Sequence, residues 1–214
     1  MTKKTKFRKV YGYCLSAAII FTCAACFSRQ EARERENEYK NILVLLERVR
    51  NVETPLSECL AQALPIAVKH NDKAFVRFCQ DELFGYKKVS AENKRARYRF
   101  LEVFCPLKKD LPGLTEESPE LFMFIDCYPE LFQKKELFIP QAITVLEKMH
   151  PADPDRSFLK LVCPARGNSS GAGFCYARGN SFLNIVEAVR GELIRKLMGL
   201  FSYAENPMLK PGDE

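Results

Sequence analysis

Histidine is nearly absent from this chain: among its 214 residues, only His70 and His150 are histidines. Neither has the spacing to Cys, Asp or Glu that metal ligands show, so we expect no metal site and no Cys/His nucleophile. Two further signatures are missing. There is no Gly-x-Ser-x-Gly elbow, and no Gly-Lys-Ser/Thr follows the glycines near Gly171. The sequence therefore predicts a protein that is not an enzyme and needs no cofactor.

Acidic residues are absent from the first 28 positions, which hold five basic ones: Lys3, Lys4, Lys6, Arg8 and Lys9. The rest of the chain carries 28 basic and 27 acidic residues, so it is nearly neutral although the whole chain has a formal charge of +6. Proteins that bind nucleic acid by releasing counterions need a basic face. This composition supplies none, and nucleic acid is not an expected partner.

A long uncharged run does occur, at residues 10–28. Its nineteen residues come close to the roughly 20 that cross a bilayer core of about 30 Å. Basic residues are retained on the cytoplasmic side of a membrane, and all five precede the run. We therefore expect residues 1–28 to be a signal or membrane anchor, which places the remainder in the cell envelope, outside the cytoplasm. A cytoplasmic protein is the alternative.

The end of this run, Thr22-Cys23-Ala24-Ala25-Cys26, resembles a bacterial lipoprotein processing site. In such sites small residues precede a cysteine that becomes lipidated, which makes Cys26 the lipidation candidate. An uncleaved anchor and ordinary cleavage after a small residue are open alternatives.

Six cysteines follow the signal: Cys59, Cys79, Cys105, Cys127, Cys163 and Cys175. An oxidising compartment would allow three disulfides, whereas a cysteine among apolar neighbours also suits a core as a free thiol. We predict one pair, Cys163 with Cys175, because each heads a copy of a short duplication. Cys-Pro-Ala-Arg-Gly-Asn-Ser at 163–169 recurs as Cys-Tyr-Ala-Arg-Gly-Asn-Ser at 175–181, and the two copies are expected to form similar turns flanking Gly171 and Gly173.

The predicted fold is α+β and mainly α-helical. Residues 29–53 predict an amphipathic stalk helix, because apolar side chains recur there at three- and four-residue spacing. These side chains are Tyr39, Ile42, Leu43, Leu46 and Val49. Residues 54–204 are expected to form one globular domain, and residues 205–214 a disordered tail.

A helical hairpin is expected at the start of the globular domain. Thr54-Pro55 is typical of a helix start, and Pro65 predicts a kink or break in that helix. The second helix is expected to begin at Asp72 and to end at Gly85. The side chains predicted to be buried on it are Phe75, Cys79 and Leu83.

The middle of the domain contains short apolar runs bounded by prolines, which favour strands or single turns. The runs are 101–107, 121–125, 137–139 and 158–162. A long C-terminal helix is predicted at 181–203, with a wide apolar face that implies core packing. Its members are Phe182, Ile185, Val186, Val189, Ile194, Leu197, Met198 and Phe201. Gly191 is expected to mark a close contact between helices.

A basic stretch separates the helical hairpin from the first of these runs. It contains Lys87, Lys88, Lys94, Arg95, Arg97 and Arg99 against one acidic residue, Glu92. These side chains are candidates for binding phosphate, anionic lipid or an acidic partner. The alternative is a solvated loop or the entry to a strand.

Several motifs resemble AbiTii-type domains, named for a phage abortive-infection protein. They are Leu56-Ser57-Glu58-Cys59-Leu60 with Ala63-Leu64-Pro65-Ile66-Ala67, then Asp81-Glu82-Leu83-Phe84-Gly85-Tyr86, and in the last helix Ile185-Val186-Glu187-Ala188-Val189-Arg190. The resemblance implies a role in phage defence as a toxin-like or sensing component, and it identifies no catalytic residue. We expect the roles of Glu82, Leu83, Gly85 and Tyr86 to be structural: packing, a turn of the chain, and an acceptor for nearby donors.

Two functional hypotheses follow. The first is a membrane-anchored interaction protein with an AbiTii-like domain that binds an unidentified protein partner in phage defence or envelope sensing. The second is an envelope lipoprotein of structural role, unrelated to defence. An unrecognised hydrolase or nuclease is a third alternative, which would require a pocket with convergent polar groups.

Overall fold

The computed structural model describes residues 30, 32–86, 96–107, 125–149, 157–163 and 173–205. It contains two compact units, Met1–Val44 and Leu45–Glu214. The predicted signal, including Cys26, and most of the predicted tail lie outside the described residues. Within the described ranges, no helix combines the length and apolarity needed to cross a bilayer.

The described part of the first unit is helical from residue 32, in a helix that continues to residue 50. Its surface carries an ion pair between Lys40 Nζ and Glu36 Oε1 at 2.8 Å, spaced to support a helix. Tyr39 and Leu43, which were expected on the apolar face, are 38% and 42% exposed.

In the second unit, the end of this helix is buried through Leu45, Leu46 and Val49. The compact unit therefore begins within the predicted stalk helix, at Leu45.

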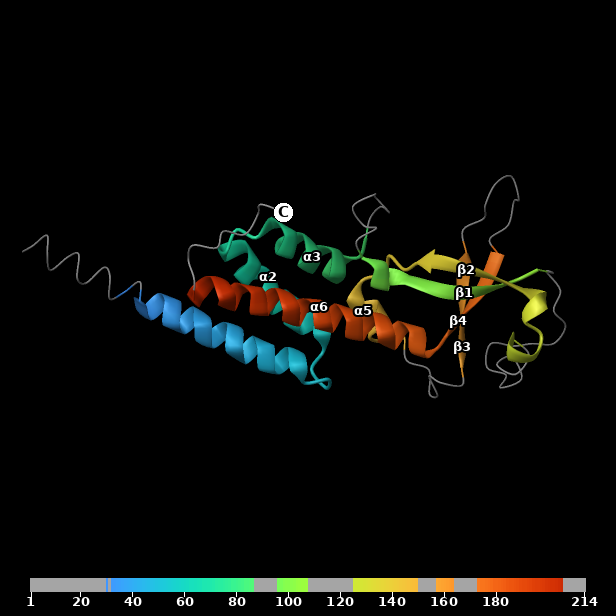
Figure 1. Ribbon diagram of the computed structural model, residues 1–214, viewed down its shortest axis with the longest axis horizontal. Helices are drawn as coiled ribbons and strands as arrows, with labels where there is room; N and C mark the ends of the chain where they lie inside the picture. The colour runs from blue at the N-terminus through green and yellow to red at the C-terminus, as the bar shows by residue number, and fades with distance from the viewer. Residues whose placement is uncertain are drawn as a thin grey trace, which may run out of the picture. The chain divides into compact units, whose positions relative to one another are not determined.

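The predicted helical hairpin is confirmed as α2 (Leu56–Lys69) and α3 (Lys73–Phe84), which pack against each other (Figure 1). Local signals define the bounds of α3. The Asp72 side chain caps its first turn by accepting a hydrogen bond from the Phe75 amide at 2.9 Å, and Gly85 follows its last residue with a positive φ of 78°. Phe75 and Cys79 are buried as predicted, whereas Leu83 is half-buried.

Of the kink or break expected at Pro65, the break is wrong, because α2 continues through that residue to Lys69. Proline removes one helical donor and so leaves the carbonyl of Ala61, four residues earlier, without its usual partner. Ala61 and Pro65 both lie on the exposed side of α2. Water can therefore donate a hydrogen bond to the Ala61 carbonyl, and the helix tolerates the proline.

Four strands form one antiparallel sheet in the order β2-β1-β4-β3 (Figure 1). They are β1 (Phe100–Pro106), β2 (Phe132–Phe138), β3 (Phe158–Cys163) and β4 (Gly173–Arg178). β1 and β3 match predicted apolar runs, so the mainly helical α+β fold with short middle strands is confirmed. β2 extends well beyond its predicted run, through four consecutive exposed polar residues at the edge of the sheet, Gln133 to Glu136.

One face of the sheet combines aromatic and basic side chains from all four strands. The register places Lys134, Phe104, Tyr176 and Lys160 in a single row across the sheet. At the Phe104 end of this face a small core forms, and the short helices at 125–127 and η3 (Pro129–Leu131) contribute to it. Its buried members are Phe104, Ile125, Phe132 and Phe158.

The second copy of the duplicated heptad does not form the turn that we expected. In the second copy, Cys175 to Arg178 belong to β4 and Asn180 begins the next helix. In the first copy, Cys163 is the last residue of β3, and residues 164–169 lie outside the described part. Sheet pairing with β3 thus decides the conformation of the second copy more strongly than its Gly-Asn-Ser turn residues do.

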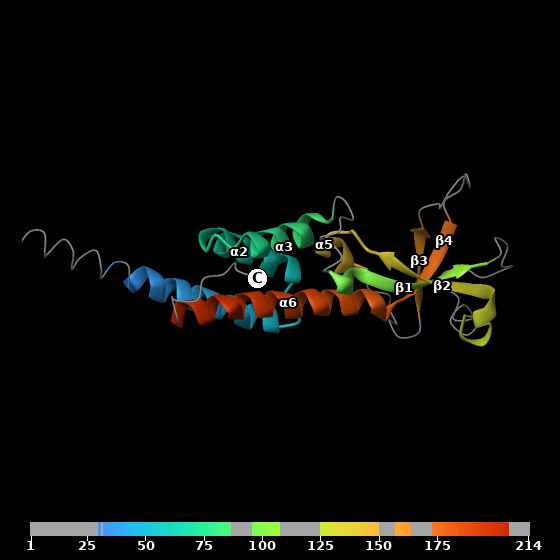
Figure 2. The same cartoon turned by 45° about the horizontal axis from the view of Figure 1, so that its top comes forward.

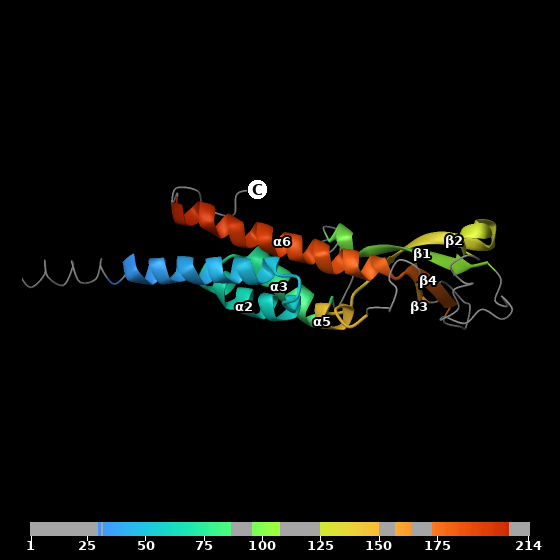
Figure 3. The same ribbon diagram turned by 90° about the horizontal axis from the view of Figure 1, so that it is seen from below.

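The long C-terminal helix is confirmed as α6 (Asn180–Glu205). It begins directly after β4 and runs away from the sheet along the helical hairpin (Figures 2 and 3). Its buried residues are Phe182, Ile185, Val186, Val189, Arg190, Leu193, Leu197 and Leu200. Three predicted core residues are not in this set: Ile194 and Phe201 are half-buried, and Met198 is 50% exposed.

Gly191 does not mark a close helix contact. A Cβ built at Gly191 would meet nothing within 4 Å, and the residue is exposed.

Candidate functional site

A buried polar cluster lies where the end of α3 meets the start of the sheet. Its centre is the carboxylate of Glu82, which has no solvent exposure. The donors around it come from two places: Tyr86 lies just after α3, and Tyr98 and Arg99 lie in the short helix η2 (Arg97–Arg99) that leads into β1. We call these four residues the Glu82 cluster.

The Glu82 carboxylate accepts hydrogen bonds from all three neighbours. Its Oε1 accepts from the Tyr86 hydroxyl at 2.6 Å and from the Tyr98 hydroxyl at 3.0 Å. Both of its oxygens also face the Arg99 guanidinium, which forms an ion pair with Oε2. The remaining Arg99 nitrogen, Nη1, donates to the Gln141 carbonyl at 2.9 Å. The guanidinium carbon of Arg99 also lies 5.3 Å from the centroid of the Tyr86 ring.

The ionisation of both tyrosines is suppressed. Burial raises the pKa of Tyr86 and of Tyr98 well above the ordinary value of 10, and the negative charge of Glu82 adds to the effect. Both hydroxyls therefore stay protonated and donate to the carboxylate. A buried charge is costly unless it is paired and hydrogen-bonded, and here the positive and negative charges meet both conditions.

Backbone contacts tie the same junction together. The Tyr86 amide donates to the Pro140 carbonyl at 2.8 Å, and the Ile139 amide donates to the Arg99 carbonyl at 2.9 Å. A side chain at Gly85 would place its Cβ only 2.7 Å from the Pro140 oxygen. The sequence motif around Glu82 therefore has a structural use: it joins the helical hairpin to the end of the β1–β2 pair at which β1 begins and β2 finishes.

This cluster corrects the predicted anion-binding stretch. Arg99 is fully buried and paired with Glu82, so it is not part of a basic surface. Arg97 is exposed and lies 3.3 Å from Glu136 of β2. Lys87, Lys88, Lys94 and Arg95 lie outside the described residues.

Two further charged residues form hydrogen bonds with backbone groups at the ends of helices. Glu147, which follows α5 (Ile143–Leu146), accepts hydrogen bonds from the first amides of α2, those of Leu56 and Ser57. This carboxylate supplies the cap that Pro55 cannot, and it places negative charge at the positive end of the helix dipole.

Arg190 of α6 caps the C-terminal end of the helix that ends at residue 50. Its Nη1 donates to the carbonyl of Val49 at 2.6 Å and to that of Asn51 at 3.2 Å. Carbonyls at a helix C-terminus lack intrahelical partners. Arg190 therefore supplies donors where they are needed, and its burial among apolar residues of α6 has a structural reason.

The cysteines fall into two groups. Cys59, Cys79, Cys105 and Cys127 are free, and burial raises the pKa of the Cys79 thiol to about 12. Cys175, by contrast, is buried and disulfide-bonded. The side chain of Cys163 lies outside the described part, so the pairing of Cys163 with Cys175 remains a prediction.

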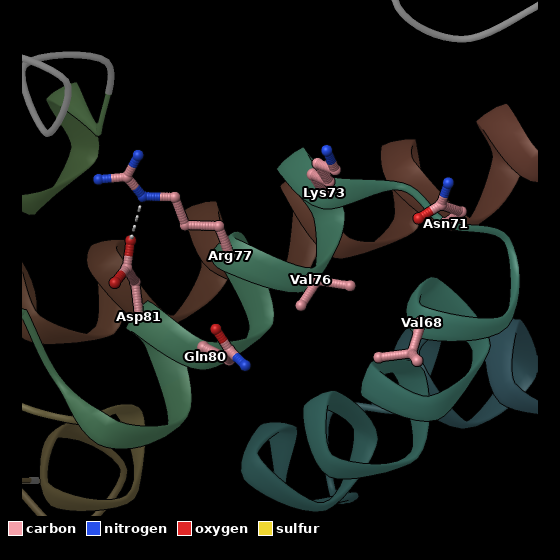
Figure 4. Close-up of a pocket in the computed structure, with 7 residues that line it drawn as sticks. All are labelled: Val68, Asn71, Lys73, Val76, Arg77, Gln80 and Asp81. Carbon is pink, nitrogen blue, oxygen red and sulfur yellow. Dashed lines mark ion pairs between the residues drawn. The ribbon is translucent and has the colours of Figure 1, made fainter.

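An open groove lies between the end of α2 and the outer side of α3 (Figure 4). Its volume is about 580 Å³. Val68 and Val76 project from the two helices, and Arg77 lies 3.7 Å from Asp81 along one side. The other lining residues are Asn71, Lys73 and Gln80. Partial burial raises the pKa of Asp81. The mixed lining suits contact with an amphipathic surface.

No protein-family model, curated protein or solved structure matches this chain. Among the residues that the structure describes, no group of three His, Cys, Asp or Glu side chains is arranged to hold a metal ion.

Sequence reasoning missed three of the residues that organise this region: Tyr98, Glu147 and Arg190. Each acts on a chain segment far away in sequence, with separations of 16 residues for Tyr98 and Glu82, 91 for Glu147 and Leu56, and 141 for Arg190 and Val49. Arg190 alone had a local signal, because it occupies an apolar position of the helical repeat of α6.

Proposed function

We propose that this chain is a membrane-anchored protein of the cell envelope whose domain lies outside the cytoplasm and binds a protein partner. The observation that supports this location is the disulfide at Cys175. Disulfides form and persist in oxidising compartments and are rare in the cytosol. The basic start and uncharged run of the N-terminus support the same location.

Binding is the activity that the described surfaces favour. The charges of the Glu82 cluster are paired with one another inside the protein, so we assign the cluster a structural role and not a binding role. The groove between α2 and α3, in contrast, presents two valines beside ionisable side chains to solvent. Apolar side chains rimmed by polar ones are typical of contact sites between proteins.

On the resemblance to AbiTii-type domains, we propose that this binding serves phage defence or envelope sensing. Under this hypothesis, cells carrying the chain resist infection and lose resistance when the groove is altered by Val76→Asp. Val145→Asp is a matched control, because Val145 is an exposed valine on α5 outside the groove. A structural lipoprotein would leave plating efficiency unchanged by either variant.

The location can be tested with a C-terminal alkaline phosphatase fusion, which is active only outside the cytoplasm. We expect an active fusion, and lipid labelling that disappears in the Cys26→Ser variant. An inactive fusion on a soluble chain would overturn the proposed location. An active fusion without lipid labelling would support the location. It would also mean that the N-terminus is an uncleaved anchor or an ordinary cleaved signal and not a lipoprotein signal.

A further inference from the structure

The loop end of the β3–β4 hairpin exposes apolar side chains. Val162 pairs with Phe174 across the two strands, and Lys160 pairs with Tyr176 in the row two residues away. Side chains alternate between the faces of a strand, so all four lie on one face. Val162 is 65% exposed and Phe174 is 51% exposed. We call these four residues the hairpin patch.

The hairpin patch is the open part of a face that is otherwise covered. Phe104 of β1 and Phe158 at the start of β3 are buried together with Ile125. Tyr176 packs against that small core and is half-buried. Beyond Tyr176 the face is open to solvent, so Val162 and Phe174 stand at the edge of an apolar layer.

The sequence of the β3–β4 hairpin carries charge of one sign, although Arg178 pairs with Asp126 at 2.9 Å. Residues 156–186 contain no aspartate or glutamate, although the chain has 27 acidic residues in 214. The same span contains Arg156, Lys160, Arg166 and Arg178. Lys160 holds its Nζ 4.3 Å from the centroid of the Phe174 ring, so a cationic group lies directly beside the exposed apolar pair.

We propose that the hairpin patch contacts the headgroup region of an anionic phospholipid bilayer. Aromatic and aliphatic side chains partition into the membrane interface, while a lysine beside them binds anionic headgroups. This inference rests on the proposed function, which holds the domain at a membrane. It adds a second contact to that of the N-terminal anchor.

The size of the hairpin patch favours a bilayer over a protein. A stable protein interface buries about 800 Å² on each partner, and the hairpin patch offers only four residues towards that area, against the seven that line the groove between α2 and α3. A membrane contact needs less buried area, because the binding free energies of two weak membrane attachments combine when both belong to one molecule. With the anchor already in the membrane, the effective concentration of lipid near the hairpin patch is high.

The chain has no tryptophan, so Phe174→Trp introduces a single tryptophan at the hairpin patch, whose emission is excited separately from that of the tyrosines. The full chain would be reconstituted into vesicles of brominated phosphatidylcholine, with or without brominated phosphatidylglycerol. We expect a blue shift and strong quenching in vesicles that contain phosphatidylglycerol. Adding Lys160→Glu to Phe174→Trp should reduce the quenching to its level in pure phosphatidylcholine. Circular dichroism establishes that each variant is folded.

Phe84→Trp is the matched control, because Phe84 is a phenylalanine on α3 that is 71% exposed and lies outside the hairpin patch. Flotation of the vesicles reports anchoring independently. If the chain floats and Phe174→Trp is quenched no more than Phe84→Trp, this inference is wrong and the proposed anchoring stands. If the chain does not float on phosphatidylcholine vesicles, the anchoring fails, whereas quenching of Phe174→Trp by phosphatidylglycerol vesicles would still support the hairpin patch.

Discussion

Glu82 and Arg99 form an ion pair in which neither side chain is exposed to solvent. Glu82 belongs to α3 and Arg99 to the turn before β1, so the pair joins the helical hairpin to the sheet. Tyr86 and Tyr98 donate to the same carboxylate. Each charge depends on the other for compensation, which makes the pair sensitive to the loss of either member.

Arg99→Met is expected to destabilise the fold by about 3–5 kcal/mol, because it leaves the Glu82 carboxylate buried without its counter-charge. Urea unfolding followed by circular dichroism measures this. The double variant Glu82→Met/Arg99→Met should cost clearly less than the sum of the two single variants, since no unpaired charge remains. Arg97→Met is the control: Arg97 pairs with Glu136 on the surface and is 75% exposed, so the change should stay within about 0.5 kcal/mol. Additive single variants would contradict the pairing.

Two glycines should respond in opposite directions to alanine. Gly85→Ala forces a side chain into a positive φ of 78° and within 2.7 Å of the Pro140 oxygen, so we expect a loss of about 1–3 kcal/mol. Gly191→Ala meets nothing within 4 Å inside α6 and should gain about 0.5–1 kcal/mol from helix propensity. Thermal melts of both variants provide the comparison. A neutral Gly85→Ala would mean that the α3 turn lacks the described contact with Pro140.

The tyrosines of the Glu82 cluster predict loss of stability at alkaline pH. Their pKa values are raised in the folded state above the value of 10.0, so the protonated hydroxyls are favoured by folding. This stabilisation is complete below pH 10 and is lost as the pH rises above 10, because the unfolded tyrosines ionise first. Absorbance at 295 nm should show a late step that coincides with unfolding. The double variant Tyr86→Phe/Tyr98→Phe should lack that step, and a titration curve unchanged in shape would refute the assignment.

Arg190→Met should release the end of the helix that terminates at residue 50. It removes charged donors from the Val49 and Asn51 carbonyls, and hydrogen bonds of this kind contribute about 1.5–3 kcal/mol. Faster hydrogen exchange at residues 45–51 should accompany the loss of stability. Arg195→Met is the matched change on the same helix, because Arg195 is 70% exposed and pairs with Glu192. Equal effects of the two variants would argue against the role assigned to Arg190.

Where the structure agrees with the sequence, the signal is local. Asp72 caps the start of α3 through the Phe75 amide, Gly85 follows its end with a positive φ, and the apolar repeat of α6 identifies it as a long helix. These features need no knowledge of the rest of the fold, so a single sequence can predict them.

Where the prediction is wrong or incomplete, the cause lies in tertiary contacts. Pro65 was expected to kink or break α2, yet the helix continues through it, because Pro65 lies on an exposed side where the lost hydrogen bond is tolerated. β2 carries four polar residues in a row, because an edge strand can leave both of its faces in water. Glu82 was expected to accept from nearby donors, but its partners lie up to 17 residues away, and the sequence did not identify which residues they are.

The location of the domain is tested most directly by the redox state of Cys175 in growing cells. Cells would be quenched in acid, free thiols alkylated under denaturing conditions with a light reagent, and disulfides then reduced and alkylated with a heavy one. Mass spectrometry of the peptides identifies the label on each cysteine. We predict the heavy label on Cys175 and the light label on Cys59 and Cys79. A light label on Cys175 would contradict both its disulfide and the proposed location outside the cytoplasm.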